Sequence, residues 1–174
     1  MKNDLCWART ILTVYRYLER IAGAIDKIIM QRARGSSNIV GQNYFYNNTL
    51  TISERLIDLS ERKVTLINLK VLVEDALAEM DEKDAQTLIE KYVDGLKNKD
   101  LAESLGVGLR TIFRRIEKAE LAFKGKIVSK GYNDIKLKNM LKDELWINNA
   151  YNAIANKGDE FDMANINLAK VVSM

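Results

Sequence analysis

The stretch KNKDLAESLGVGLRTIFRRIEKAELAFKGK (residues 97–126) carries the strongest structural signal in this chain: two helical patterns separated by a tight turn. One face of the first pattern carries apolar residues at helical spacing: Leu101, Ala102 and Leu105. Gly106 follows where the chain has to reverse, and glycine enters the left-handed backbone region without steric cost. We therefore expect a helical hairpin with Gly106 in its turn and Val107 filling the angle between the helices.

The second helix of this hairpin is expected to begin near Gly108 and Leu109 and to have two contrasting faces. Apolar residues spaced four, three and four apart point inward: Ile112, Ile116, Ala119 and Phe123. The opposite face carries a basic stripe, flanked by a threonine and a further arginine: Arg110, Arg114 and Lys118, then Thr111 and Arg115.

This arrangement suits a DNA-binding helix-turn-helix. Guanidinium and hydroxyl groups near the start of a helix can meet phosphates and guanine edges, and lysines on the preceding helix can meet phosphates. Basic helix faces are most often only solvated, but Ala102, Gly106 and both isoleucines also fall at the offsets that such a hairpin needs. The candidate DNA-binding residues are Lys97, Lys99, Arg110, Thr111, Arg114, Arg115 and Lys118.

Residues 84–119 resemble region 4 of the sigma-70-type bacterial transcription factors. The resemblance lies in AQTLIEKYVDGLKNKDLAESLGV (residues 85–107) and GLRTIFRRIEKA (residues 108–119). It includes the aliphatic, tyrosine-containing segment LIEKYVDG (residues 88–95), which precedes the helix-turn-helix in that family. The resemblance implies double-stranded DNA as the partner and RNA polymerase as a second one.

Two departures from the family pattern qualify this resemblance. Gly108 stands where the family usually has a serine that caps the recognition helix, a change that costs roughly a few tenths of a kcal/mol. No stretch resembles sigma region 2, which melts the promoter with aromatic side chains. The resemblance therefore implies a small regulator of a bacterium or phage rather than a complete sigma factor.

Composition favours an all-α fold. The 174 residues contain no proline and are rich in helix-forming leucine, isoleucine, alanine, lysine and glutamate. The net charge of +3 is unevenly distributed: residues 74–94 hold eight acids against two lysines, and residues 97–126 hold eight basic residues against four acids. The acids of residues 81–84 are best explained as helix-start residues that favour the helix dipole.

The sequence gives little support to enzyme chemistry. It has no histidine, no paired cysteines and no Walker loop, and the glycines Gly106 and Gly108 lack the third glycine of a dinucleotide site. We expect no catalytic residue, metal or cofactor. The single cysteine, Cys6, is expected to be buried and suits a reducing cytoplasm, and no run of 18 apolar residues predicts a membrane span. These features indicate a cytoplasmic protein without a membrane partner, in the bacterial nucleoid or a phage-infected cell.

The amino-terminal half predicts two long helices around a polar loop at residues 35–48, where Tyr44, Phe45 and Tyr46 either contact a partner or cap a core. The first helix has an alternating three-four seam, widened by Leu12, Ile21 and Ile28: Ala8, Ile11, Tyr15, Leu18, Ala22, Ile25 and Ile29. The second, at residues 52–80, is apolar around most of its circumference, with a strand at Val71–Val73 as the lesser alternative. A monomeric bundle and a coiled-coil homodimer both satisfy this pattern, and we expect the homodimer because apolar surface exceeds what two helices bury by pairing.

After Gly125 the pattern predicts one helix over residues 135–154, with Leu137, Leu141 and Leu145 on one stripe and Gly158 ending it. Residues 161–174 would form a short helix or a tail. The expected organisation is a helical bundle or oligomerisation region at residues 1–80, a helix-turn-helix domain at residues 81–130, and a carboxy-terminal helix and tail at residues 131–174.

Three functions fit these expectations. The first is a sequence-specific, sigma region 4-like transcription regulator that binds promoter DNA. The second is a phage DNA-packaging recognition subunit resembling a small terminase, which would form a ring rather than a dimer. The third is a helical interaction adaptor, or anti-sigma-like module, whose helix-turn-helix does not bind DNA.

Overall fold

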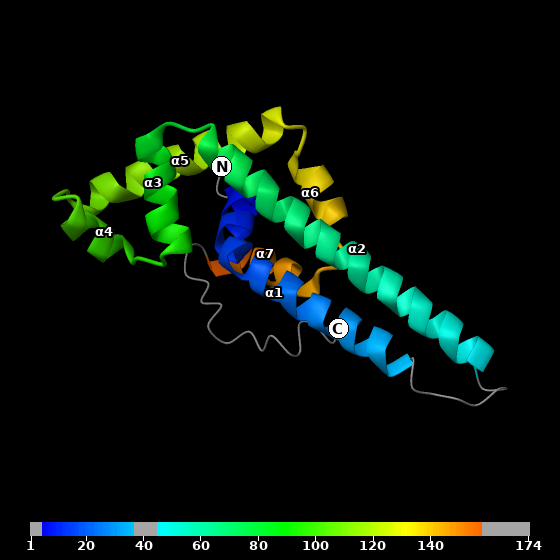
Figure 1. Cartoon of the computed structure of the whole chain (residues 1–174). Helices are drawn as coiled ribbons and strands as arrows, with labels where there is room; N and C mark the ends of the chain where they lie inside the picture. The colour runs from blue at the N-terminus through cyan, green and yellow to red at the C-terminus, as the bar shows by residue number, and fades with distance from the viewer. Residues whose placement is uncertain (1–4, 37–44, 158–174) are drawn as a thin grey trace.

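The structure, a computed structural model, describes residues 5–36 and 45–157, and every regular element in those residues is helical (Figure 1). The elements in chain order are α1 (Cys6–Ser36), α2 (Phe45–Ala78), α3 (Glu82–Leu88), the π-helix η2 (Ile89–Val93), α4 (Asn98–Ser104), α5 (Leu109–Ser129), α6 (Asp134–Met140) and α7 (Leu145–Lys157). The all-α prediction is confirmed. None of these helices is long and apolar enough to span a membrane.

Helices α1 and α2 lie antiparallel and side by side as a long hairpin (Figure 1). The predicted seam of α1 is buried at five positions: Ala8, Ile11, Leu18, Ala22 and Ile25. It packs in one core with residues of α2 that also follow helical spacing: Leu59, Leu66, Leu69, Val73 and Ala76. The seam of α1 is thus filled within the chain.

Helix α7 packs against α1 as well, and its side chains extend the same core. The ring of Trp7 stacks on that of Tyr151 with centroids 4.5 Å apart, and Leu12 and Ile21 are fully buried. The extra apolar width of α1 therefore serves more than one neighbour. Cys6 is buried here as predicted, and this burial raises the pKa of its thiol.

The carboxy-terminal helix predicted over residues 135–154 is wrong, because the chain breaks into α6 and α7. A buried glutamate lies at the break: Glu144 accepts hydrogen bonds from Arg62 Nε of α2 at 2.9 Å and from Trp146 Nε1 at 2.9 Å. The side-chain amide of Asn148 donates to the carbonyl of Leu141 at 3.0 Å and so satisfies the end of α6. Leu145, expected inside, is about half exposed.

Two further expectations about α2 need correction. The helix begins at Phe45, so the loop predicted to extend to residue 48 ends before that residue. Tyr44 of that loop lies outside the described residues. The predictions for Gly158 and residues 161–174 also concern residues outside the described ones. Val71–Val73 is helical, as the main prediction had it, and the strand alternative is wrong. The outer side of α2 is exposed within the described chain, notably at Ile57 and Val64, although the helix was expected to be buried on most sides.

The helix-turn-helix sits at one end of the hairpin (Figure 1). Helix α5 crosses there and contributes Ala119, Phe123 and Ile127 to the main core, together with Leu88 of α3. The first half of α5 is the second helix of the helix-turn-helix, and the second half of α5 packs in the core of the bundle.

Candidate nucleic-acid interface

The turn between α4 and α5 is built by a glycine in the left-handed region. Gly106 has φ of +61°, and the amides of Gly106 and Val107 donate to the carbonyls of Glu103 at 3.2 Å and Ala102 at 3.0 Å. These two bonds form a Schellman motif, which satisfies the last carbonyls of α4. The predicted turn at Gly106 is confirmed.

A small core of its own fixes the angle between α4 and α5. It consists of Leu101, Ala102, Ile112 and Ile116, with Val107 packed against it. Helix α5 starts at Leu109 with the extended residue Gly108 as its N-cap, and the Gly108 carbonyl accepts from the amide of Ile112 at 3.1 Å. The predicted start, the inward isoleucines and the role of Val107 are all confirmed.

One residue predicted to face this core does not. Leu105 is 40% exposed, because it is the C-cap of α4 with φ of −91° and ψ of 0°, beyond the last helical residue. The chain is already turning towards Gly106 there, so the helical phase of Leu101 no longer applies to it.

The outer face of α5 carries the predicted basic residues, all exposed: Arg110, Thr111, Arg114, Arg115 and Lys118. Arg110, Arg114 and Lys118 are spaced four apart and so share one side of the helix. Their exposure follows from the buried phase on the opposite side, at Ile112 and Ile116. Helix α5 thus presents cationic side chains along its first turns.

Within the described residues, two of the seven candidate residues have acidic neighbours. Lys118 Nζ lies 3.1 Å from Asp84 of α3, and Lys99 Nζ lies 3.9 Å from Glu103 within α4. Both lysines are mostly exposed, and ion pairs in that situation contribute little to stability. These pairs leave both lysines able to turn towards a phosphate. Lys97, the N-cap residue of α4, is exposed as well.

Two exposed apolar residues in the first turns of α5 were not among the predicted site residues. Leu109 is 48% and Phe113 is 50% exposed, and both lie beside the arginines in the chain. An exposed phenylalanine next to Arg114 adds an apolar contact surface of the kind that thymine methyl groups meet in a major groove.

A buried carboxylate joins the helix-turn-helix to the bundle. Glu120 of α5 is fully buried and accepts hydrogen bonds from Arg9 Nε of α1 at 2.8 Å and from the Tyr92 hydroxyl of η2 at 2.5 Å. Lys91 Nζ of η2 lies 4.0 Å from the same carboxylate. Three elements that are distant in the sequence therefore meet at one anion.

One feature of the sequence, the position of Glu120, could have indicated this site but was not used in the prediction. Glu120 falls between Ala119 and Phe123, within the inward phase of α5, where a charge requires a partner. The partners could not be named, because Arg9 lies 111 residues away and the π-helix has no local sequence signature. π-Helical turns are frequent at functional sites, and here one places both Lys91 and Tyr92 next to Glu120.

The far end of α5 is anchored by a second ion pair. Lys130, the C-cap of α5, donates to Glu79 at the end of α2 at 2.6 Å. This hydrogen bond holds the pKa of Glu79 below its ordinary value and raises the pKa of Lys130. The two contacts, at Glu120 and Lys130, leave the outer face of the first turns of α5 uncovered in the described chain.

Comparison with known families agrees with this geometry. The family model described as Sigma-70, region 4 matches residues 70–122. This region is a sigma-70 region 4-like helix-turn-helix domain. No curated protein and no solved structure matches the chain.

The sigma region 4-like domain is somewhat longer than the resemblance seen at residues 84–119. It runs from the last turns of α2 through α3, η2 and α4 to Ala122 of α5, so α1, α6 and α7 lie outside it. The π-helix and its Tyr92 fall inside the match, whereas Arg9 does not. Domains of this family bind DNA and are not enzymes.

Replacing Glu120 tests the joint between this domain and the bundle. Glu120→Ala removes the carboxylate that lies against the guanidinium of Arg9 and near the ammonium of Lys91, and breaking a buried ion pair costs about 3–5 kcal/mol. Chemical denaturation of the variant should show that loss of unfolding free energy. Glu117→Ala, at an exposed position of the same helix, should change it by less than about 0.5 kcal/mol. Equal effects of the two changes would contradict a supporting role for Glu120.

Proposed function

We propose that this protein is a sequence-specific transcription regulator that lays the outer face of α5 in the major groove of duplex DNA. The observation that carries the proposal is the exposure of Arg110, Thr111 and Arg114 at the start of a helix whose other face is fixed by the small core. The first turns of a recognition helix are the part that reaches base edges. The match to sigma-70 region 4 supports the same use of this surface.

The geometry supports a division of labour among the candidate residues. Arg110 and Arg114 lie on the outer face of α5, where a guanidinium can make two hydrogen bonds to one guanine. Lys97 and Lys99 belong to the start of α4 and are better placed for the phosphate backbone, which positions the protein without reading sequence. Lys118, the last member of the stripe, and Arg115, which flanks it, add phosphate contacts.

Two partners besides DNA belong to the proposal. RNA polymerase is one, because the domain resembles the region of sigma factors that joins promoter recognition to polymerase. A second copy of this chain is the other, because one small helix-turn-helix reads few base pairs and regulators of this kind commonly use two half-sites. The protein then acts where bacterial or phage promoters are, in the cytoplasm.

Salt-dependent binding to duplex DNA is the first test of the proposal. If about six phosphates are neutralised, affinity should fall about a thousandfold between roughly 50 and 200 mM salt. Fluorescence anisotropy with a pool of random duplexes and with promoter fragments measures this slope. The double change Arg110→Ala with Arg114→Ala should weaken binding strongly, whereas Lys138→Ala with Lys142→Ala, exposed on and beside α6, should not. A folded protein that binds no duplex at low salt would favour the adaptor function instead.

The second test separates base reading from phosphate contact. Arg114→Ala should relax sequence preference, because one bidentate guanine contact contributes about 1–3 kcal/mol of discrimination. Lys99→Ala should weaken all sequences alike and lower the salt slope by about one. Arg114→Lys keeps the charge but loses the planar fork, so it should behave like the alanine variant towards specificity. Selection from a random duplex library for each variant gives the comparison; identical losses on selected and random DNA for every variant would overturn this assignment.

A further inference from the structure

The outer side of α2 carries a second apolar stripe, distinct from the face that packs on α1. Four of its members fall seven residues apart and are exposed by 57, 57, 54 and 46%: Leu50, Ile57, Val64 and Val71. Ile67, 40% exposed, follows Val64 by three residues. A strict seven-residue repeat keeps side chains on one side of a helix that pairs with another helix. The described chain covers one apolar face of α2 and leaves this one open.

A hollow of about 290 Å³ borders the stripe, between α1 and α2. Ile67 and Val71 line it from α2, and Leu18, Ala22 and Gly23 line it from α1. Gly23 leaves room there, because a Cβ added to it would meet no atom within 4 Å. The hollow side of the hairpin thus has space for the side chains of an incoming helix.

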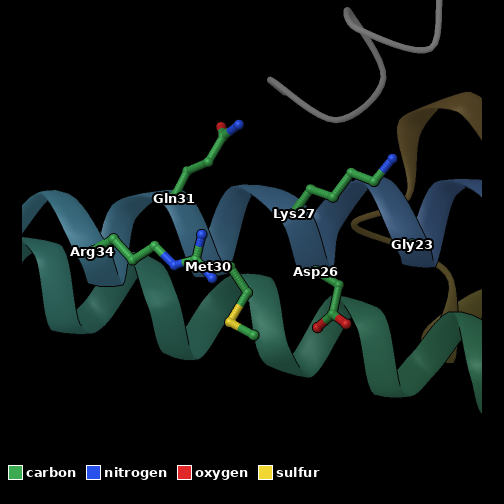
Figure 2. A pocket seen from close by; sticks show the side chains of 6 residues that line it. All are labelled: Gly23, Asp26, Lys27, Met30, Gln31 and Arg34. Atoms are coloured by element: carbon green, nitrogen blue, oxygen red, sulfur yellow. The ribbon is translucent and has the colours of Figure 1, made fainter.

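The concave surface continues along α1 past Gly23 (Figure 2). Figure 2 shows Asp26 and Met30 on the side of α1 next to α2, while Gln31 and Lys27 point away from it. The Met30 side chain is 56% exposed, so it adds apolar surface along the same groove.

Charges along the two flanks of the stripe are of opposite sign. Four residues after each of three stripe positions comes an acid: Glu54, Glu61 and Asp75. On the other flank, one residue before Val64 and before Val71, stand Lys63 and Lys70, held at the edge of the hollow by Asp26 and Glu19 of α1. Two antiparallel copies would set the acidic flank of one against the acidic flank of the other, whereas two parallel copies set Glu54 and Glu61 against uncharged positions and bring Lys70 of each copy beside Asp75 of the other.

We propose that a second copy of this chain covers the stripe, with the two α2 helices parallel. Leu50 to Val71 spans about 32 Å at the rise of an α-helix, enough for three heptads of contact. A parallel pair places both helix-turn-helices at the same end of the dimer, since each follows the end of its own α2. The use of that arrangement for two DNA half-sites rests on the proposed function, but the pairing itself does not.

Mass in solution, measured without DNA, tests the pairing. Light scattering at micromolar concentration should give twice the chain mass for the parent and a twofold lower mass for Val64→Glu. Val128→Glu replaces a similarly exposed valine, on α5, and should keep the dimer. Circular dichroism should show the same helix content for both variants, because neither side chain is buried within the described chain and Val64→Glu leaves each copy folded. A parent of single-chain mass, a ring of higher mass, or a dimer indifferent to Val64→Glu would overturn the proposal.

Disulfide cross-linking tests the parallel direction. In a parallel pair Val64 faces Val64 of the partner subunit, so Val64→Cys in a Cys6→Ser background should cross-link on mild oxidation, and Val128→Cys in that background should not. A dimer that fails to cross-link through position 64 would overturn the parallel arrangement. A monomer that dimerises only when cut after Lys157 would show that residues 158–174 cover the stripe, which also overturns the proposal. A parent that dimerises but binds no duplex would overturn the proposed function alone.

Discussion

One buried carboxylate determines how the helix-turn-helix of this protein is held against the helical bundle. Glu120 lies on the inner side of α5, and its charge is met by Arg9 of the first helix and by Tyr92 and Lys91 of the π-helix. A buried charge is tolerated only when its partners are in place, so α1, η2 and α5 can adopt few relative positions. Because α5 is continuous, fixing Glu120 on its inner face also fixes the direction of the arginines on its outer face. The orientation of the surface that we propose to face DNA therefore depends on a contact with Arg9, which lies outside the region matched by the family model.

The helix-turn-helix itself could be predicted because its determinants are local. A left-handed glycine, an alanine at the crossing and isoleucines at helical offsets all lie within residues 97–126, and each fixes its neighbours through backbone hydrogen bonds or short-range packing. The buried seam of α1 could be predicted equally well, because apolar residues at helical spacing indicate a buried face. Periodicity does not say what buries that face, and α2 and α7 of the same chain fill it.

The features that escaped prediction depend on contacts between distant residues. The carboxy-terminal helical pattern breaks beside Glu144, which is bound by Arg62, 82 residues earlier. The burial of Glu120 likewise requires the distant residue Arg9. Leu105 was predicted to face the core but is exposed, because α4 ends at Ser104, one residue sooner than the apolar pattern suggests. The apolar circumference of α2 was recognised, but only the folded hairpin separates the face used within the chain from the stripe left outside. A sequence lists side chains without pairing them, and three of these four features depend on such pairings, whereas the exposure of Leu105 follows from a local helix cap.

We propose that the outer face of α5, held from behind at Glu120, is the surface that meets DNA. The most direct measurement is the change in backbone amide chemical shifts of the folded protein as duplex DNA is added. The largest changes are expected at residues 109–118 and in the first turn of α4, with the amides of α7 and of the outer side of α2 nearly unchanged. Changes concentrated on α7 or on the outer side of α2, with α5 unaffected, would contradict it.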